Sequence, residues 1–158
     1  MKKNIEFLIK FFVIFAVLQA IIWIAPLGAL NEWIAGFEAG LLGLKHEGSE
    51  LFSFDAKYII SNSCTGLVSG SILAAIVFSL KKPEFKKKIA IFGIGAALLL
   101  VINLGRVYLV ILSGIKYGFD AADILHTISW FVMSGLIIGV WFLLTKKWAK
   151  IKDFSELL

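Results

Sequence analysis

Four long apolar runs constrain the fold of this chain more than any other feature of its sequence. Each reaches or approaches the roughly 20 residues that an α-helix needs to cross a hydrocarbon core of about 30 Å. Apolar residues make up 59% of the 158 residues and the mean hydropathy is +0.91, far above the values of soluble domains. We therefore predict an all-α membrane protein, one membrane domain over residues 1–158, with four transmembrane helices at about 7–30, 64–80, 89–112 and 127–145.

The distribution of lysine predicts the orientation of these helices. The amino terminus, the 81–88 loop and the tail hold twelve lysines, whereas the other two loops hold only Lys45, Lys57 and Lys116. By the positive-inside rule, both termini are expected to be cytoplasmic, with residues 31–63 and 113–125 outside the cell membrane. The first run is too long for an ordinary signal-peptide core, so we interpret it as a retained signal anchor. Lysines confined to short loops indicate topology, so no nucleic acid partner is expected.

The outer segment 31–63 contains two patterns. Residues 31–44 place Trp33, Ile34, Phe37 and Leu41 at near-helical spacing, which predicts a helix lying on the membrane surface. From residue 52 to residue 60, apolar and polar side chains alternate, which is typical of an extended segment. An outer interfacial helix and a short extended segment are thus expected before the second span.

Arg106 is the residue that most needs a functional explanation. It lies about 26 Å along a helix counted from Ile89, near the outer boundary but still within the third span. An ionisable residue inside a span should face protein or trapped water, and it indicates a functional site. The alternative is an arginine that extends to the outer headgroups.

Cys64 and His126 also lie at outer helix ends. Cys64 is expected in the first turn of the second span, where the helix dipole favours a thiolate, and any of Ser61, Asn62 and Ser63 could cap this helix. His126 begins the fourth span, and Asp123 on the same helix face could orient its ring. Taken singly, each residue has a simpler interpretation. Cys64 would be a small apolar residue that fills space, and His126 would be a histidine at the membrane interface. His46 is expected to be solvated in a loop.

The coincidence of these three residues carries the functional hypothesis. Three different spans each bring one of Cys64, Arg106 and His126 to a similar depth at the outer face. A thiolate, a proton-exchanging imidazole and a fixed cation are the groups that acyl transfer from a peptide requires. Asn103, one helical turn before Arg106, could add a donor. A single cysteine excludes an internal disulfide, and with two histidines it makes a poor ligand set, so no metal or cofactor is expected.

These residues carry a resemblance to a known family. Ser63-Cys64-Thr65-Gly66-Leu67, then Asn103-Leu104-Gly105-Arg106, then His126 resemble the exosortase/archaeosortase family of membrane cysteine transpeptidases, with the archaeosortase type favoured. The resemblance covers about residues 48–144. It implies that Cys64 is the nucleophile and that Arg106 and His126 complete the active site, with Ser63, Thr65, Asn103 and Asp123 in supporting roles. Only one span precedes the core here, whereas family members commonly have more.

The resemblance implies a membrane-embedded cysteine protease or transpeptidase. Its partners would be secreted proteins with a carboxy-terminal sorting signal, made of a short motif, an apolar helix and a basic tail. The enzyme would transfer the cleaved protein, through a thioacyl intermediate, to an acceptor for which a membrane lipid is one candidate. Two alternatives are open: a non-enzymatic assembly or transporter subunit in which Arg106 pairs with Asp120 or Asp123, and a proton-coupled carrier. The carrier would need polar residues deeper in the spans, which offer few.

Overall fold

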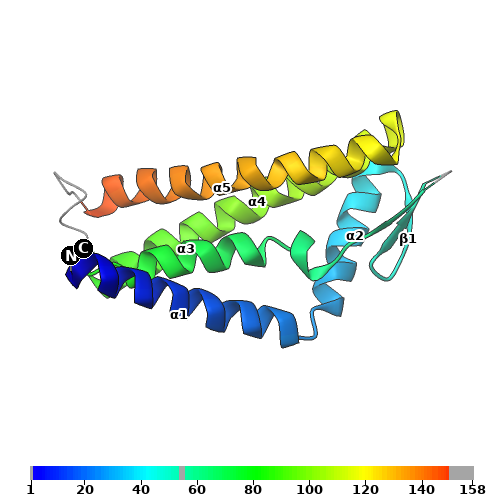
Figure 1. Ribbon diagram of the computed structural model, residues 1–158. Helices are drawn as coiled ribbons and strands as arrows, with labels where there is room; N and C mark the ends of the chain where they lie inside the picture. The colour runs from blue at the N-terminus through cyan, green and yellow to red at the C-terminus, as the bar shows by residue number, and fades with distance from the viewer. Residues whose placement is uncertain (1, 54–55, 150–158) are drawn as a thin grey trace.

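The chain folds into a helical bundle with a small cap at one end (Figure 1). A computed structural model describes residues 2–53 and 56–149. The helices are α1 (Lys2–Ile24), α2 (Gly28–Leu42), α3 (Leu67–Ser79), α4 (Phe85–Tyr117) and α5 (Phe119–Ala149), with a short 3₁₀ turn η1 (Asn62–Cys64). The strands β1 (Lys45–Glu47), β2 (Glu50–Phe52) and β3 (Lys57–Ile59) form an antiparallel sheet in the order β1-β2-β3.

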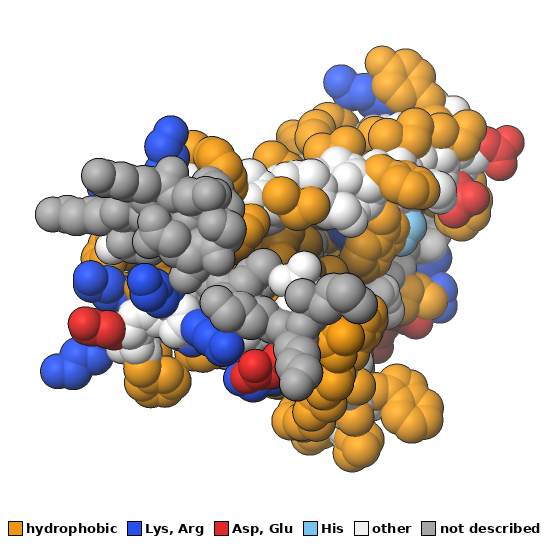
Figure 2. Space-filling model, turned by 60° about the vertical axis from the view of Figure 1, so that its left-hand side comes forward, with side chains coloured by type: hydrophobic (Ala, Val, Ile, Leu, Met, Phe, Trp, Pro, Cys, Tyr) orange, Lys and Arg blue, Asp and Glu red, His pale blue; other side chains and the backbone are white. Residues whose placement is uncertain are grey.

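Helices α1, α3, α4 and α5 run lengthwise beside one another, and α2 crosses one end of this bundle next to the sheet (Figure 1). At the opposite end, Lys81 Nζ lies 3.5 Å from Glu6 Oε2 and joins the α3–α4 connection to the start of α1. Figure 2 shows basic side chains gathered at that end and apolar side chains over much of the remaining surface. The molecule therefore has a lysine-rich end and a capped end.

Three of the four predicted spans are long enough to cross a membrane as helices. Residues 4–24 of α1, all of α4 and residues 119–148 of α5 are sufficiently long and apolar. Many of their large side chains are exposed, as expected of a surface that faces lipid. Helix α3 has 13 residues and a length of about 20 Å, which is short of the hydrocarbon core by itself.

Several predicted boundaries were wrong, each at an identifiable residue. The first helix ends at Ile24 rather than residue 30, because Pro26 cannot continue it and the chain turns into α2. The predicted outer loop 113–125 is almost entirely helical, since only Gly118, at φ 90°, separates α4 from α5. The 31–44 helix prediction corresponds to α2, which begins three residues earlier.

The extended segment proved to be part of a sheet. Leu51 pairs with Tyr58 across β2 and β3, and both are buried against α2 and α4. Tyr58 lies so close to Gly114 of α4 that a Cβ at this glycine would overlap the phenol ring. His46 belongs to β1 rather than a loop, and its ring lies against Gly36 of α2. The sheet thus ties the capped end to α4, next to Arg106.

The capped end also buries one carboxyl group. Glu38 of α2 has no exposed surface, and neither of its oxygens has a hydrogen-bond partner within the described residues. Desolvation raises the pKa of Glu38 to about 7. The protonated form is therefore the one that the fold accommodates.

This burial predicts that stability falls as the pH rises. Below the ordinary pKa of 4.5, Glu38 is protonated in both the folded and unfolded chain, so its contribution to stability is fully present. Between 4.5 and about 7 only the unfolded chain ionises, and the free energy of unfolding decreases by about 2–3 kcal/mol. Glu38→Gln should remove this decrease in thermal unfolding measured in detergent at pH 5 and pH 8. Glu32→Gln, at an exposed position of α2, is the control and should keep the wild-type pH dependence.

Candidate active site at the capped end

The turn that carries Cys64 is fixed by three asparagines and a threonine. Asn103 of α4 donates from Nδ2 to the Cys64 carbonyl oxygen at 2.7 Å, and Asn31 of α2 donates to Asn62 Oδ1 at 2.9 Å. The fully buried Thr65 donates from Oγ1 to the Asn62 carbonyl at 2.7 Å. Anchors from α2, α4 and the turn itself therefore hold the backbone of Cys64 in one position.

Cys64 was predicted to lie inside the first turn of α3, but it lies before this helix. It is the last residue of η1, and α3 begins only at Leu67, after Gly66 at φ +79°. A Cβ at Gly66 would come within 3.2 Å of Asn103, so this glycine also permits the close approach of α4. The thiol is therefore presented from a tight turn at the end of the helix.

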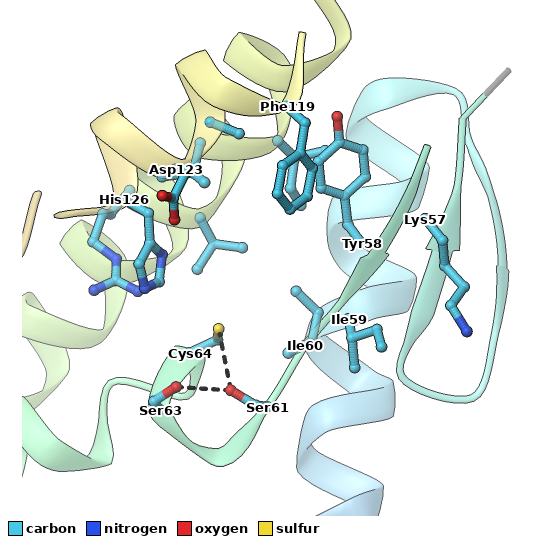
Figure 3. Close-up of a pocket in the computed structure, with 15 residues that line it drawn as sticks. Lys57, Tyr58, Ile59, Ile60, Ser61, Ser63, Cys64, Phe119, Asp123 and His126 are labelled. Carbon is cyan, nitrogen blue, oxygen red and sulfur yellow. Dashed lines mark hydrogen bonds between the residues drawn. The ribbon is translucent and has the colours of Figure 1, made fainter. Parts of the chain in front are cut away.

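The Cys64 thiol is half-buried and has polar neighbours. Ser61 Oγ lies 3.7 Å from Cys64 Sγ and 2.7 Å from Ser63 Oγ, and the sulfur points into a pocket (Figure 3). Ser63, one of the three candidates for the helix cap, makes no capping hydrogen bond and lines the pocket instead. These hydroxyls give the thiol a polar environment in an otherwise apolar bundle.

The pocket has a volume of about 380 Å³ and is built by β3, the Cys64 turn, α4 and α5. It brings together Cys64, Arg106, Asp123 and His126, which come from segments far apart in the sequence. Figure 3 shows Asp123 and His126 above the Cys64 sulfur, with Tyr58 and Phe119 at the other side. A peptide segment entering this pocket would meet a thiol, a guanidinium and an imidazole together.

Arg106 is buried, and no described residue forms an ion pair with it. Only 7% of its surface is exposed, and its Nε has no hydrogen-bond partner among the described residues. The guanidinium carbon lies 4.7 Å from the centre of the Trp130 ring, a cation–π contact. No ion pair with Asp120 or Asp123 is found in the described part of the chain, although a purely structural role predicted one. The cation is thus left with hydrogen-bonding capacity beside the pocket.

His126 is held by Trp130 rather than by Asp123. The Trp130 Nε1–H donates to His126 Nε2 at 3.1 Å, and no hydrogen bond joins His126 to Asp123, which is exposed at the pocket rim. The prediction that Asp123 orients the ring was therefore wrong for this conformation. An acceptor at Nε2 places the proton of the neutral ring on Nδ1.

Two of the predicted supporting residues lie behind the pocket. Asn103 is 1% exposed, and its amide nitrogen binds the Cys64 carbonyl rather than facing the pocket as an additional donor. Thr65 is likewise directed to the turn. Both residues position the cysteine. Among the described residues, no group of three or more His, Cys, Asp or Glu side chains could hold a metal ion.

Sequence reasoning missed Trp130 and the β3 residues that line the pocket. Trp130 follows His126 by four residues and so shares its helix face. That spacing was a usable signal. Tyr58 of β3 and Ile60, the residue that follows this strand, gave no comparable signal, because their place at the pocket depends on the sheet.

A second cavity borders the residues that follow Cys64. It is an apolar groove of about 730 Å³ between α1, α3 and α4, and it begins at Thr65 and Gly66. Small residues of α3, including Gly70 and Ala74, form part of its wall. The groove and the pocket thus border neighbouring residues of the same turn.

No protein-family model, curated protein or solved structure matches this chain.

Proposed function

We propose that this protein is a membrane-embedded cysteine protease or transpeptidase of the exosortase/archaeosortase type, acting on secreted proteins with a carboxy-terminal sorting signal. The observation that carries the proposal is the single pocket lined by Cys64, Arg106 and His126. The buried guanidinium of Arg106 adds to it, because it has no ion-pair partner in residues 2–53 and 56–149, whereas a bundle held together by ion pairs would pair it. Few structural roles require these three side chains to meet.

The proposed topology has four crossings, with both termini and the lysine-rich 81–88 segment in the cytoplasm. Helices α1, α4 and α5 each cross the membrane. The fourth crossing consists of α3, which is short, together with the turns on either side of it. Helix α2 would then lie at the outer interface, and the pocket would open to the outside of the plasma membrane. The pocket lies at the capped end, opposite the lysine-rich end of the bundle, and this separation supports the proposed orientation.

The reaction would proceed through a thioester. The Cys64 thiol gives its proton to His126, and the thiolate sulfur attacks the scissile carbonyl carbon. Arg106 stabilises the oxyanion that forms, and its collapse breaks the C–N bond while the His126 imidazolium protonates the departing amine. An acceptor amine, hydroxyl or water then loses a proton to His126, attacks the thioester and releases the Cys64 thiol.

The groove beside the Cys64 turn supports lateral entry of the substrate. An apolar helix of a sorting signal could pack against the small residues of α3, as helices do in lipid. Because the groove begins at Thr65 and Gly66, the segment preceding that helix would emerge next to Cys64. The scissile bond would therefore lie just outside the membrane.

A trapped acyl-enzyme would test the proposal directly. Cells that co-express the protein and a tailed substrate are denatured in acid, and the peptide containing Cys64 is analysed by mass spectrometry. We expect a substrate fragment attached to Cys64 that neutral hydroxylamine releases, as it does a thioester. Complete processing of the substrate with Cys64 found only as the free thiol, even under conditions lacking an acceptor, would contradict the covalent mechanism.

A further inference from the structure

Trp130 contacts both Arg106 and His126, the two partners of Cys64 in the proposed reaction, through different parts of one indole. Its ring face lies 4.7 Å from the Arg106 guanidinium carbon, and its Nε1–H donates to His126 Nε2 at 3.1 Å. The His126 and Trp130 rings are also packed edge to face, with centroids 6.1 Å apart. Trp130 is partly buried on α5, and it lies one helical turn beyond His126.

The hydrogen bond restricts what His126 can do. An imidazole nitrogen that accepts a hydrogen bond carries no proton, so neutral His126 has its proton on Nδ1. The Nε2 lone pair is occupied by the indole, and Nδ1–H is a donor. The ring therefore has no lone pair available for the Cys64 proton in this conformation.

We propose that Trp130 is a positioning residue that holds His126 as the Nδ1–H tautomer with Nε2 occupied, and holds Arg106 against its ring face. This inference rests on the proposed function for its significance. The catalytic cycle then includes a step in which the Trp130–His126 hydrogen bond opens and Nε2 becomes free to take the thiol proton. Arg106 can keep its contact with the indole face during this step, because that contact does not use Nε1.

Two substitutions separate the two contacts. Trp130→Phe keeps an aromatic face for Arg106 but removes the N–H, whereas Trp130→Leu removes both. The ¹⁵N shifts of His126 in the purified, detergent-solubilised full chain report the tautomer at a pH where the ring is neutral. We expect the Nδ1–H tautomer in the wild type and loss of its dominance in Trp130→Phe. Trp148→Phe on the same helix, away from the pocket, is the control and should leave the His126 spectrum unchanged.

Alkylation of Cys64 by iodoacetamide provides a second measurement that needs no substrate. With Nε2 free, Trp130→Phe should be alkylated several-fold faster than the wild type at neutral pH, and adding His126→Gln should abolish this gain. An unchanged tautomer in Trp130→Phe, or a gain that persists without His126, would overturn the inference. If both measurements behave as expected and no substrate is cleaved by the wild type, only the proposed function fails.

Discussion

Replacement of Cys64 with alanine is expected to abolish removal of the tail from a co-expressed substrate, with a loss of about 10³-fold or more. Without the sulfur no thioester can form, and no other cysteine exists in the chain to replace it. The fold should be unaffected, because the side chain is half-buried and the turn is held through the backbone by Asn103. Immunoblotting for full-length and processed substrate measures the result.

Ser61→Ala is the matched control for this experiment. It removes the hydroxyl 3.7 Å from Cys64 Sγ but leaves the thiol in place, so cleavage should stay within several-fold of the wild type. Equal expression and thermal stability of the two variants would show that the comparison concerns chemistry. Continued tail removal by Cys64→Ala would eliminate the nucleophile assignment and favour a non-enzymatic assembly or transporter subunit.

The apolar helices could be predicted because each depends on many residues at once. A hydropathy average over about 20 residues tolerates a few exceptions, so the runs that became α1, α4 and α5 were unmistakable. The ends of the helices depend on single residues instead. Pro26 ended α1 early, and Gly118 was enough to join α4 to α5 without a loop. Averages carry no information about such local events.

The sheet was missed for a related reason. Its strands have three residues each, too few to establish an alternating pattern individually. The alternation from residue 52 to 60 revealed an extended chain, but the pairing partner lay in the segment interpreted as a loop. Pairing is a tertiary property, and Tyr58 finds its place only because Gly114 leaves room for it.

The end of the bundle at which the candidate site lies could be predicted, but the contacts of its side chains could not. The order of the spans was sufficient to predict that Cys64, Arg106 and His126 lie near the same end, and one pocket contains all three. The rotation of α4 and α5 about their axes was not predictable, and it decides that Asn103 faces the Cys64 carbonyl and that Trp130 faces Arg106. The catalytic roles of these residues remain predictions.

Arg106 provides the second large expected effect, because its contributions to activity and stability should have opposite signs. Arg106→Met removes the cation proposed to stabilise the oxyanion, and a loss of about 10²–10³-fold in the rate of cleavage is expected. The same change removes a buried charge that has no ionic partner among the described residues, and it supplies an apolar side chain of similar length. The thermal stability in detergent should therefore stay the same or increase by about 1 kcal/mol.

Arg106→Lys completes this test by keeping the charge while removing the planar guanidinium. Lysine cannot offer two fixed N–H groups to one oxygen or stack flat on Trp130, so only partial activity, intermediate between arginine and methionine, is expected. A structural arginine predicts a different pattern, in which Arg106→Met is the least stable variant and cleavage falls only in proportion to the folded protein. The alternative result is an Arg106→Met protein that is inactive but at least as stable as the wild type. It would mean that Arg106 serves the reaction, because its buried charge does not stabilise the fold.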